Sequence, residues 1–526
     1  MPRTYRIHPA VGIARVGDSP DDYFVGPEAP GVPPSLHKPD APPSPNGTYK
    51  DRQGRIKRQG ARFRIYEYTH DDANVLVQVR EITSAEAQID WDVHLANRKA
   101  AAPRFDAPGR RNDGVPESKL IIDAGRQHIS VAEQCMKRLR GSFQGSAAHA
   151  IEVTLGDLLT DSAGRLIILG GFGTSQSLAP TAERQKIEHF ANNDDWCDDV
   201  SDGPVRATIQ LHGTTEAIEA ESAWVIVAPP DFAPPIENVI TLYDVVYNMM
   251  ARFDPALAVS EASNISFTRD IYPILRRVSD MHWVSEIAAG AHGPNMAGHF
   301  ISQLAPLSSN ASAEAVRRGR IFRKLRNPEG GGGNMPKLPA STEANAIVAL
   351  TEVQYQRMEK WAKGEFEADW NGQEPTPLAL DELPVQDRPH ALDRAALEAC
   401  VGGGFYPGIE VGGMMQEEST YEQARPFRIN AQLLPGTLTA RMAVPWQADF
   451  FYCSFQDEDE NDPQDGMDWW PGQRPNQVFR GHERERWVPS TWNTPERMVK
   501  EWSKLGFVVR EKDEDRYIEA ERDAAL

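Results

Sequence analysis

Cysteine is scarce in this sequence, basic residues are outnumbered by acidic ones, and long apolar runs are missing. Only four of the 526 residues are cysteine, and they form no Cys-x-x-Cys pair, which argues against a disulfide scaffold and a zinc site. The formal net charge of -20 argues against binding to nucleic acid or to an anionic membrane surface. These absences favour a globular protein whose partner is a small molecule.

Targeting signals are also missing from the sequence. The opening residues MPRTYRIHPAVG lack the apolar core of a signal peptide. No segment approaches the roughly 18 apolar residues that a membrane-spanning helix needs. We therefore expect a cytoplasmic protein, for which later export stays open. With 526 residues, the chain is long enough for two or three domain-sized cores.

The first part of the chain alternates apolar and polar residues in the manner typical of β-strands. In the run AQIDWDVHLAN, every second residue from Ile89 to Leu95 is apolar. The run NVLVQVRE repeats the pattern through Val75, Val77 and Val79. Each run predicts a half-buried strand with one apolar face.

The pattern changes along the chain from strands to helices and loops. Because the early strand-like runs follow one another without regular helices between them, an antiparallel sheet is favoured. Later, STEANAIVALTEVQYQRMEKWAKG spaces its apolar residues for a helix capped by Ser341 or Thr342. The sequence therefore predicts an α+β fold, with a β-rich antiparallel domain over 1–240 and a helix- and loop-rich domain with the site over 241–526.

One cysteine is placed at the predicted end of a helix. The run HALDRAALEAC, which follows the proline-rich stretch 371–390, puts Leu392, Ala396 and Cys400 on one helix face. Gly402 is placed to stop the helix. The negative partial charge at a helix C-terminus disfavours a thiolate, so a papain-type nucleophile is not expected. Taken alone, these residues favour a buried structural cysteine.

A tandem of tryptophans stands between an acidic loop and a Pro/Arg turn in the run DGMDWWPGQRPNQ. Trp469 and Trp470 cannot both point into one core if the backbone is extended. Taken alone, they favour one core aromatic and one surface aromatic. Arg474 is the nearest cation by sequence, and it suits either recognition of a carboxylate or a brace for the turn.

Segments spread over nearly the whole chain resemble one known family. They include IHPAVGIARVGDSPDDYFVGPE, DWDVHLANRKAA, VAPPDFAPPIENVITLYD, CVGGGFYPGIE, AVPWQADF and WWPGQRP. In these runs the chain resembles the lysine ε-oxidase/glycine oxidase family of quinoproteins, whose members carry cysteine tryptophylquinone (CTQ) made from their own side chains. The resemblance implies that Cys400 is the thioether donor and that Trp469 or Trp470 becomes the quinone, with a weak preference for Trp469.

The same resemblance implies an activity and partners. It implies an oxidase that deaminates a primary amine of an amino acid, with oxygen as the acceptor, and releases ammonia and hydrogen peroxide. A flavin-dependent maturation protein and a homo-oligomer are also implied. Because a thiol must be held against one edge of an indole ring, we expect the turn and its neighbours to shape the cofactor site. These neighbours are Gly402, Gly403, Phe405 and Arg474.

One position departs from the family pattern. The family carries an aspartate four residues before the cysteine, and Ala396 stands there in this chain. Asp393 and Glu398 are the nearest carboxylates, but they project from other faces of the helix than Cys400. Glu410, in the turn after the glycines, is a further candidate. Catalytic candidates are thus Cys400, Trp469, Trp470, Glu410, Asp393 and Glu398.

Two other interpretations stay open because of this departure. In one, the chain has lost the quinone and serves as a binding scaffold. In the other, a CTQ enzyme modifies the amine of a peptide or natural product. A covalent link between cysteine and tryptophan separates the scaffold from both enzymes.

No metal site is predicted from the histidine and aspartate patterns. His292 and His299 lie in a glycine-rich segment without a ligand pattern. The loop NNDDWCDDVSDGP does not match a calcium loop and favours a solvated acidic turn. Its aspartates are Asp194, Asp195, Asp198, Asp199 and Asp202.

Overall fold

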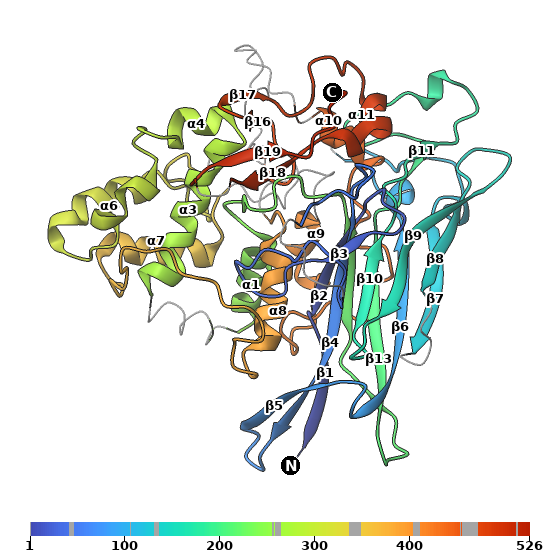
Figure 1. The fold of residues 1–526 in the computed structure, drawn as a ribbon, viewed down its shortest axis with the longest axis horizontal. Coiled ribbons are helices and arrows are strands. Elements are labelled where there is room, and N and C mark those ends of the chain that lie inside the picture. Colours follow the sequence, from blue (N-terminus) through green and yellow to red (C-terminus); the bar gives the residue numbers. More distant parts are fainter. Residues whose placement is uncertain are drawn as a thin grey trace.

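A large sheet of strands occupies one side of the molecule, and most helices occupy the other (Figure 1). The structure is a computed structural model. It describes residues 2–40, 47–105, 107–130, 136–254, 257, 265–335, 349–402, 411–452, 454, 472–511 and 514–526.

The large sheet contains 13 strands, most of them antiparallel. Along its main path the order is β7-β6-β13-β15-β2-β4-β10-β9-β8, and the end strands β7 and β8 lie side by side, so the sheet curls toward a barrel. The strands are β1 (Arg3–His8), β2 (Val11–Arg15), β3 (Tyr23–Val25), β4 (Arg58–His70), β5 (Leu76–Ile82), β6 (Ala87–Asn97), β7 (Ile122–Ser130), β8 (Lys137–Phe143), β9 (Ile151–Thr160), β10 (Leu166–Gly170), β13 (Ser201–Leu211), β14 (Ile218–Glu219) and β15 (Ala223–Ala228).

The helices follow the sheet in the chain. They are α1 (Leu242–Phe253), α3 (Tyr272–Asp280), α4 (Glu286–His292), α5 (Leu304–Leu307), α6 (Ala315–Phe322), α7 (Glu352–Lys363), α8 (Arg388–Glu398), α9 (Gly412–Met415), α10 (Trp446–Tyr452) and α11 (Pro495–Glu501). Three small hairpins pair β11 (Gln176–Ser177) with β12 (Trp196–Cys197), β16 (Gln477–Arg480) with β17 (Glu483–Arg486), and β18 (Phe507–Arg510) with β19 (Tyr517–Ala520). The predicted α+β fold class, β-rich first and helix- and loop-rich second, is confirmed.

The alternation in β6 is confirmed, whereas that in β5 is wrong at its start. In β6 the apolar residues from Ile89 to Leu95 are buried in the main core. In the β4–β5 hairpin Val75 is 58% exposed and Val77 is 52% exposed, and only Val79 is buried. The reason is that β5 pairs with β4 at the margin of the sheet, and its outer end projects beyond the body of the molecule (Figure 1).

The helix predicted after Ser341 or Thr342 begins later than expected. Both predicted caps lie outside the described residues. Helix α7 begins at Glu352, because the Thr351 side chain accepts a hydrogen bond from the Gln354 N–H and the Gln354 side-chain oxygen accepts one from the Thr351 N–H. This capping box was missed because the apolar spacing also continues upstream of it.

The acidic loop is not a solvated turn, so that expectation is wrong. Asp198, Asp199 and Asp202 are buried. Asp198 forms a buried ion pair with Lys99, and Asp202 accepts a hydrogen bond from the Trp224 indole at 2.9 Å. Burial of Asp198 and Asp202 is possible because a cation and N–H donors from distant parts of the chain satisfy these two carboxylates, whereas Oδ1 of Asp199 has no hydrogen-bond partner among the described residues.

Candidate active site at the end of helix α8

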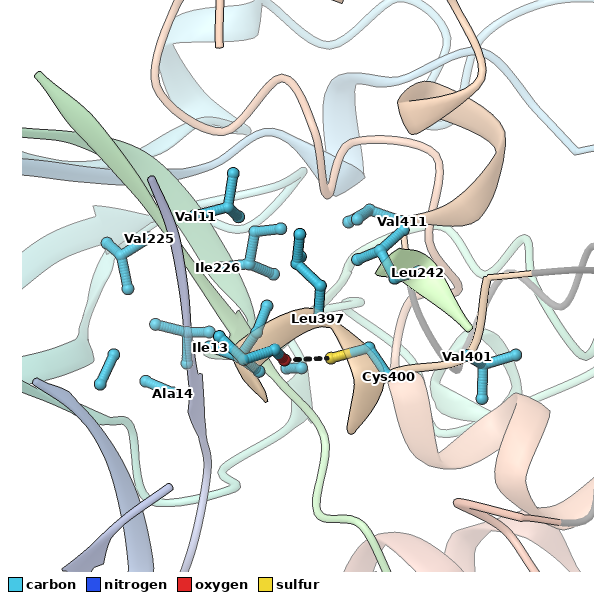
Figure 2. Packing of buried hydrophobic residues seen from close by; sticks show 14 of the residues in the cluster. Val11, Ile13, Ala14, Val225, Ile226, Leu242, Leu397, Cys400, Val401 and Val411 are labelled. Carbon is cyan, nitrogen blue, oxygen red and sulfur yellow. Dashed lines mark hydrogen bonds between the residues drawn. The ribbon is translucent and has the colours of Figure 1, made fainter. Parts of the chain in front are cut away.

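Helix α8 ends beside the large sheet and delivers Cys400 to the core. Leu392, Ala396 and Cys400 are all buried, but Leu392 packs in a small cluster with Tyr66 and Tyr68, whereas Ala396 and Cys400 belong to the main core. The helix stops at Glu398, two residues before the cysteine. The Cys400 thiol points back to the carbonyl oxygen of Ala396, 3.5 Å away, among apolar residues that include Leu397 (Figure 2).

Arg15 is the cation next to the thiol. It ends strand β2, is buried, and its Nη2 lies 3.5 Å from the Cys400 sulfur. The guanidinium also donates to the carbonyl oxygens of Ala399 at 3.0 Å and Pro229 at 2.9 Å. It thereby joins the sheet, the end of α8 and the chain that leaves β15. A cation at this distance also stabilises negative charge that develops on sulfur.

We call the chain between β15 and α1, residues 229–241, the connector. It contacts residues 400–402, which we call the cysteine arm. The Leu242 N–H donates to the Cys400 carbonyl, and the Gly402 N–H donates to Ile240, each at 3.0 Å. A Cβ added at Gly402 would lie 2.0 Å from the carbonyl oxygen of Thr241. Only glycine therefore permits this approach of the two backbones.

The same connector also holds the chain that follows the tandem tryptophans. The Phe232 N–H donates to the Gln473 carbonyl at 2.9 Å, and the Gln473 side chain donates to Pro229 at 3.3 Å. A Cβ added at Gly472 would lie 2.7 Å from Nδ2 of Asn238. We call residues 472–474, which follow the tandem tryptophans in the sequence, the tryptophan arm. The cysteine arm and the tryptophan arm thus both contact the connector.

Several predicted site residues lie outside the described residues. These are Trp469, Trp470, Gly403, Phe405 and Glu410.

Arg474 is buried away from solvent. Its Nη1 donates to the carbonyl oxygen of Asp449 at 3.0 Å and to the Asp449 carboxylate at 3.3 Å. Asp449 belongs to α10, and both side chains are fully buried. Arg474 therefore ties the tryptophan arm to α10.

A cavity of about 380 Å³ opens at this junction. Ala395, Glu398 and Ala399 of the α8 end line it, together with Arg15 and Asp231. This volume is within the range of about 300–1,000 Å³ typical of small-molecule sites. The cavity therefore reaches the residue that precedes Cys400.

The two predicted carboxylates of α8 have different surroundings. Glu398 lines the cavity, accepts a hydrogen bond from Arg394 at 2.8 Å, and has its pKa raised by burial. Asp393 is not among the residues that line the cavity. It binds His8 Nδ1 at 2.9 Å and the Ala10 N–H at 2.6 Å. Burial opposes ionisation of Asp393, but these partners hold its pKa below the usual value.

Among the described residues, no three His, Cys, Asp or Glu side chains are grouped so that they could hold a metal ion. Likewise, none of the described helices is both long and apolar enough to span a membrane.

Arg15 and Asp231 were missed at the level of sequence. Each lies far along the chain from Cys400, so no local spacing connects them. The available signal was weak in both cases: an arginine closes the apolar strand VGIAR, and an aspartate interrupts the proline-rich run APPDFAPP.

A curled sheet followed by a region of helices and loops defines an architecture that also occurs in solved L-Lys ε-oxidase structures. The crystal structure of the L-Lys ε-oxidase from Marinomonas mediterranea superimposes with a TM-score of 0.75 at 23% identity, over 99% of this chain and 95% of that chain. The structure of that enzyme's Schiff base intermediate with L-Lys gives the same values. This likeness establishes the fold.

Sequence comparison adds the family. The model for the L-lysine ε-oxidase N-terminal region matches residues 8–227, and the model for its C-terminal domain matches residues 330–470. L-lysine 6-oxidase of Marinomonas mediterranea is 29% identical over 560 aligned positions, covering 87% of this chain and 72% of that enzyme. Together the two models cover more than half of the chain, which belongs to the lysine ε-oxidase family. Membership supports an amine-oxidising enzyme.

Proposed function

We propose that this chain is an oxidase that carries CTQ formed from Cys400 and either Trp469 or Trp470. In this proposal it oxidatively deaminates the primary amine of an amino acid, with oxygen as the acceptor, and releases ammonia and hydrogen peroxide. A flavin-dependent maturation protein and a homo-oligomeric state belong to the proposal on the family resemblance alone.

The observation that carries the proposal is the convergence of two arms on the connector. The cysteine arm binds it at Ile240 and Thr241, and the tryptophan arm binds it at Pro229 and Phe232. Gly402 leaves no room for a Cβ against the Thr241 carbonyl, and a Cβ at Gly472 would crowd the side chain of Asn238. The chain's own residues therefore fit a cross-link between the two arms.

The quinone, once formed, supplies an electrophilic carbonyl and accepts two electrons from the substrate. The protein's part is positioning and charge. Arg15 fixes the end of α8 through Ala399 and contacts the sulfur. The apolar core around Cys400 excludes water from its sulfur, while the cavity, which reaches Ala399 and Arg15, leaves space for a small molecule nearby.

The proposal is tested by assaying protein that has been co-expressed with its flavoprotein partner. Ammonia and hydrogen peroxide are measured for each of the twenty amino acids. We expect the two products in equal amounts for a subset of them, and none from a Cys400→Ser variant prepared in the same way. If cross-linked protein releases neither product from any amino acid, the proposed activity is wrong.

A further inference from the structure

One carboxylate in the cavity has no part in positioning either arm. Asp231 lines the cavity, and its Oδ1 accepts a hydrogen bond from the Ala233 N–H at 2.9 Å. Within the part of the chain that the structure describes, its Oδ2 accepts no hydrogen bond. The second oxygen is therefore available to a molecule in the cavity.

The backbone around Asp231 is held from both sides. Pro229 and Pro230 accept hydrogen bonds from the Gln473 side chain at 3.3 and 3.4 Å. The Phe232 N–H donates to Gln473, and Pro229 also accepts from Arg15. Asp231 thus stands between the tryptophan arm and the arginine that contacts Cys400.

The electrostatic setting suits a zwitterion. Removal from water raises the pKa of Asp231, and the positive charge of Arg15 opposes that rise. The two charges face the same cavity without a direct ion pair between them in the described residues. The ammonium of an α-amino acid complements Asp231, and the positive charge of Arg15, whose N–H groups already donate to Pro229, Ala399 and the Cys400 sulfur, attracts the amino acid's carboxylate at longer range.

The wall next to Asp231 is aromatic. Tyr49 stacks on Phe507 with ring centroids 4.5 Å apart, and Phe24 meets Tyr49 edge-on at 5.9 Å. All three line the cavity, and Asp231 is close enough to help raise the pKa of the Tyr49 hydroxyl. Lys57 also lines the cavity, but its ammonium donates to two backbone carbonyls. This wall suits an apolar side chain.

We infer that Asp231 binds the ammonium group of an α-amino acid with an apolar side chain and accepts its proton, while the aromatic wall receives the side chain. The inference rests on the proposed function. In this step one proton passes from the substrate nitrogen to the Asp231 carboxylate. The products are a neutral amine and a neutral carboxylic acid, and no electrons move. The neutral amine is the nucleophilic form that an oxidative deamination requires.

The first test compares Asp231→Asn with Glu152→Gln in the partner-matured full chain. Glu152 is a matched control, because it is an exposed carboxylate on β9 that pairs with Arg140. We expect wild type to oxidise L-phenylalanine and L-leucine at least about 10-fold more efficiently than glycine and L-lysine. We expect Asp231→Asn to lower kcat/KM for L-phenylalanine by about 100-fold or more, and Glu152→Gln to leave it unchanged.

The second test measures binding without turnover. N,N-dimethyl-L-phenylalanine keeps both charges and the apolar side chain, but its nitrogen is not a primary amine. Calorimetry is expected to show at least about 10-fold weaker binding to Asp231→Asn than to wild type, with Glu152→Gln unchanged. Equal binding to all three proteins overturns the role of Asp231, and a wild-type preference for glycine or L-lysine overturns the apolar specificity.

Peptide mapping of the same samples separates this inference from the proposed function. A cross-link in wild type and in Asp231→Asn shows that the variant folds and matures. A wild type without the cross-link overturns the proposed function, and the titration then still decides whether Asp231 binds the ammonium.

Discussion

Cys197 and Cys400 are buried to the same extent, each 2% exposed, yet opposite charges surround them. Cys197 lies in β12 beside Asp198 and Asp199, and burial together with these two carboxylates raises the pKa of its thiol. Cys400 has the guanidinium of Arg15 3.5 Å from its sulfur. One thiol is held neutral, whereas the other is next to a cation.

The two sites also differ in what they face. Asp198 next to Cys197 is neutralised by Lys99 in a fully buried ion pair, and Cys197 does not line the described cavity. Cys400 follows Ala399, which does line it. Burial alone therefore does not distinguish a reactive cysteine from a structural one. The two cysteines differ in the charge next to the sulfur and in whether a cavity lies nearby.

The largest expected difference between the two sites is in activity. Cys400→Ser should abolish the cross-link and lower oxidase activity by about 1,000-fold or more, because it removes the thioether donor. Cys197→Ala should keep both and cost about 1 kcal/mol of stability through a small cavity. Peroxide release and intact mass check each variant. Equal activity loss in the two variants would remove the distinction between the sites.

The second prediction concerns pH and the Cys197 site. Burial, and then the charge of Asp198, raises the pKa of Asp199 from 3.8 to about 7 in the folded protein. Because the folded pKa exceeds the unfolded one, the stabilising effect of protonation is complete below pH 3.8 and is lost as the pH rises through about 7. Asp199→Asn should therefore be more stable than wild type at pH 8, by up to about 4 kcal/mol.

Denaturant unfolding at pH 5 and pH 8 checks this prediction. The wild type should lose stability between the two values, and Asp199→Asn should lose much less. A variant that follows the wild-type pH dependence would show that Asp199 does not titrate between pH 5 and pH 8 in the folded protein.

The smallest expected effect concerns the backbone contact that holds the Cys400 arm. Gly402→Ala should destabilise the protein by about 3 kcal/mol and reduce the cross-linked fraction, because its Cβ meets the Thr241 carbonyl. Gly290→Ala is the control: Gly290 lies in α4, and an added Cβ meets no atom within 4 Å. Its stability should change by less than about 1 kcal/mol. Thermal unfolding distinguishes the two, and similar melting temperatures would contradict the tight contact.

Local periodicity predicted the elements whose packing depends on nearby residues. The alternation in β6 and the shared helix face of Leu392 and Ala396 were predictable, because a strand or helix presents such residues together whatever surrounds it. The exposed β5 was not predictable, since its burial depends on whether a second layer covers the sheet margin.

Contacts between distant residues account for the features that were missed. The acidic loop is buried because Lys99 and other distant donors reach it, and no local pattern encodes those partners. The resemblance pointed to Cys400 and the tryptophans. It did not reveal that Arg15 contacts Cys400, that Asp231 lines the nearby cavity, or that Gln473 binds Pro229, because only the fold brings these positions together.

The most direct measurement is peptide mapping of the purified protein, expressed with and without its flavoprotein partner. We expect one peptide from matured protein that joins the Cys400 segment to the Trp469-Trp470 segment, with a gain of two oxygen atoms and a loss of four hydrogen atoms. Separate, unmodified peptides from the matured sample would contradict the convergence of the two arms as a cofactor site. They would leave the chain as a scaffold in which Cys400 only packs.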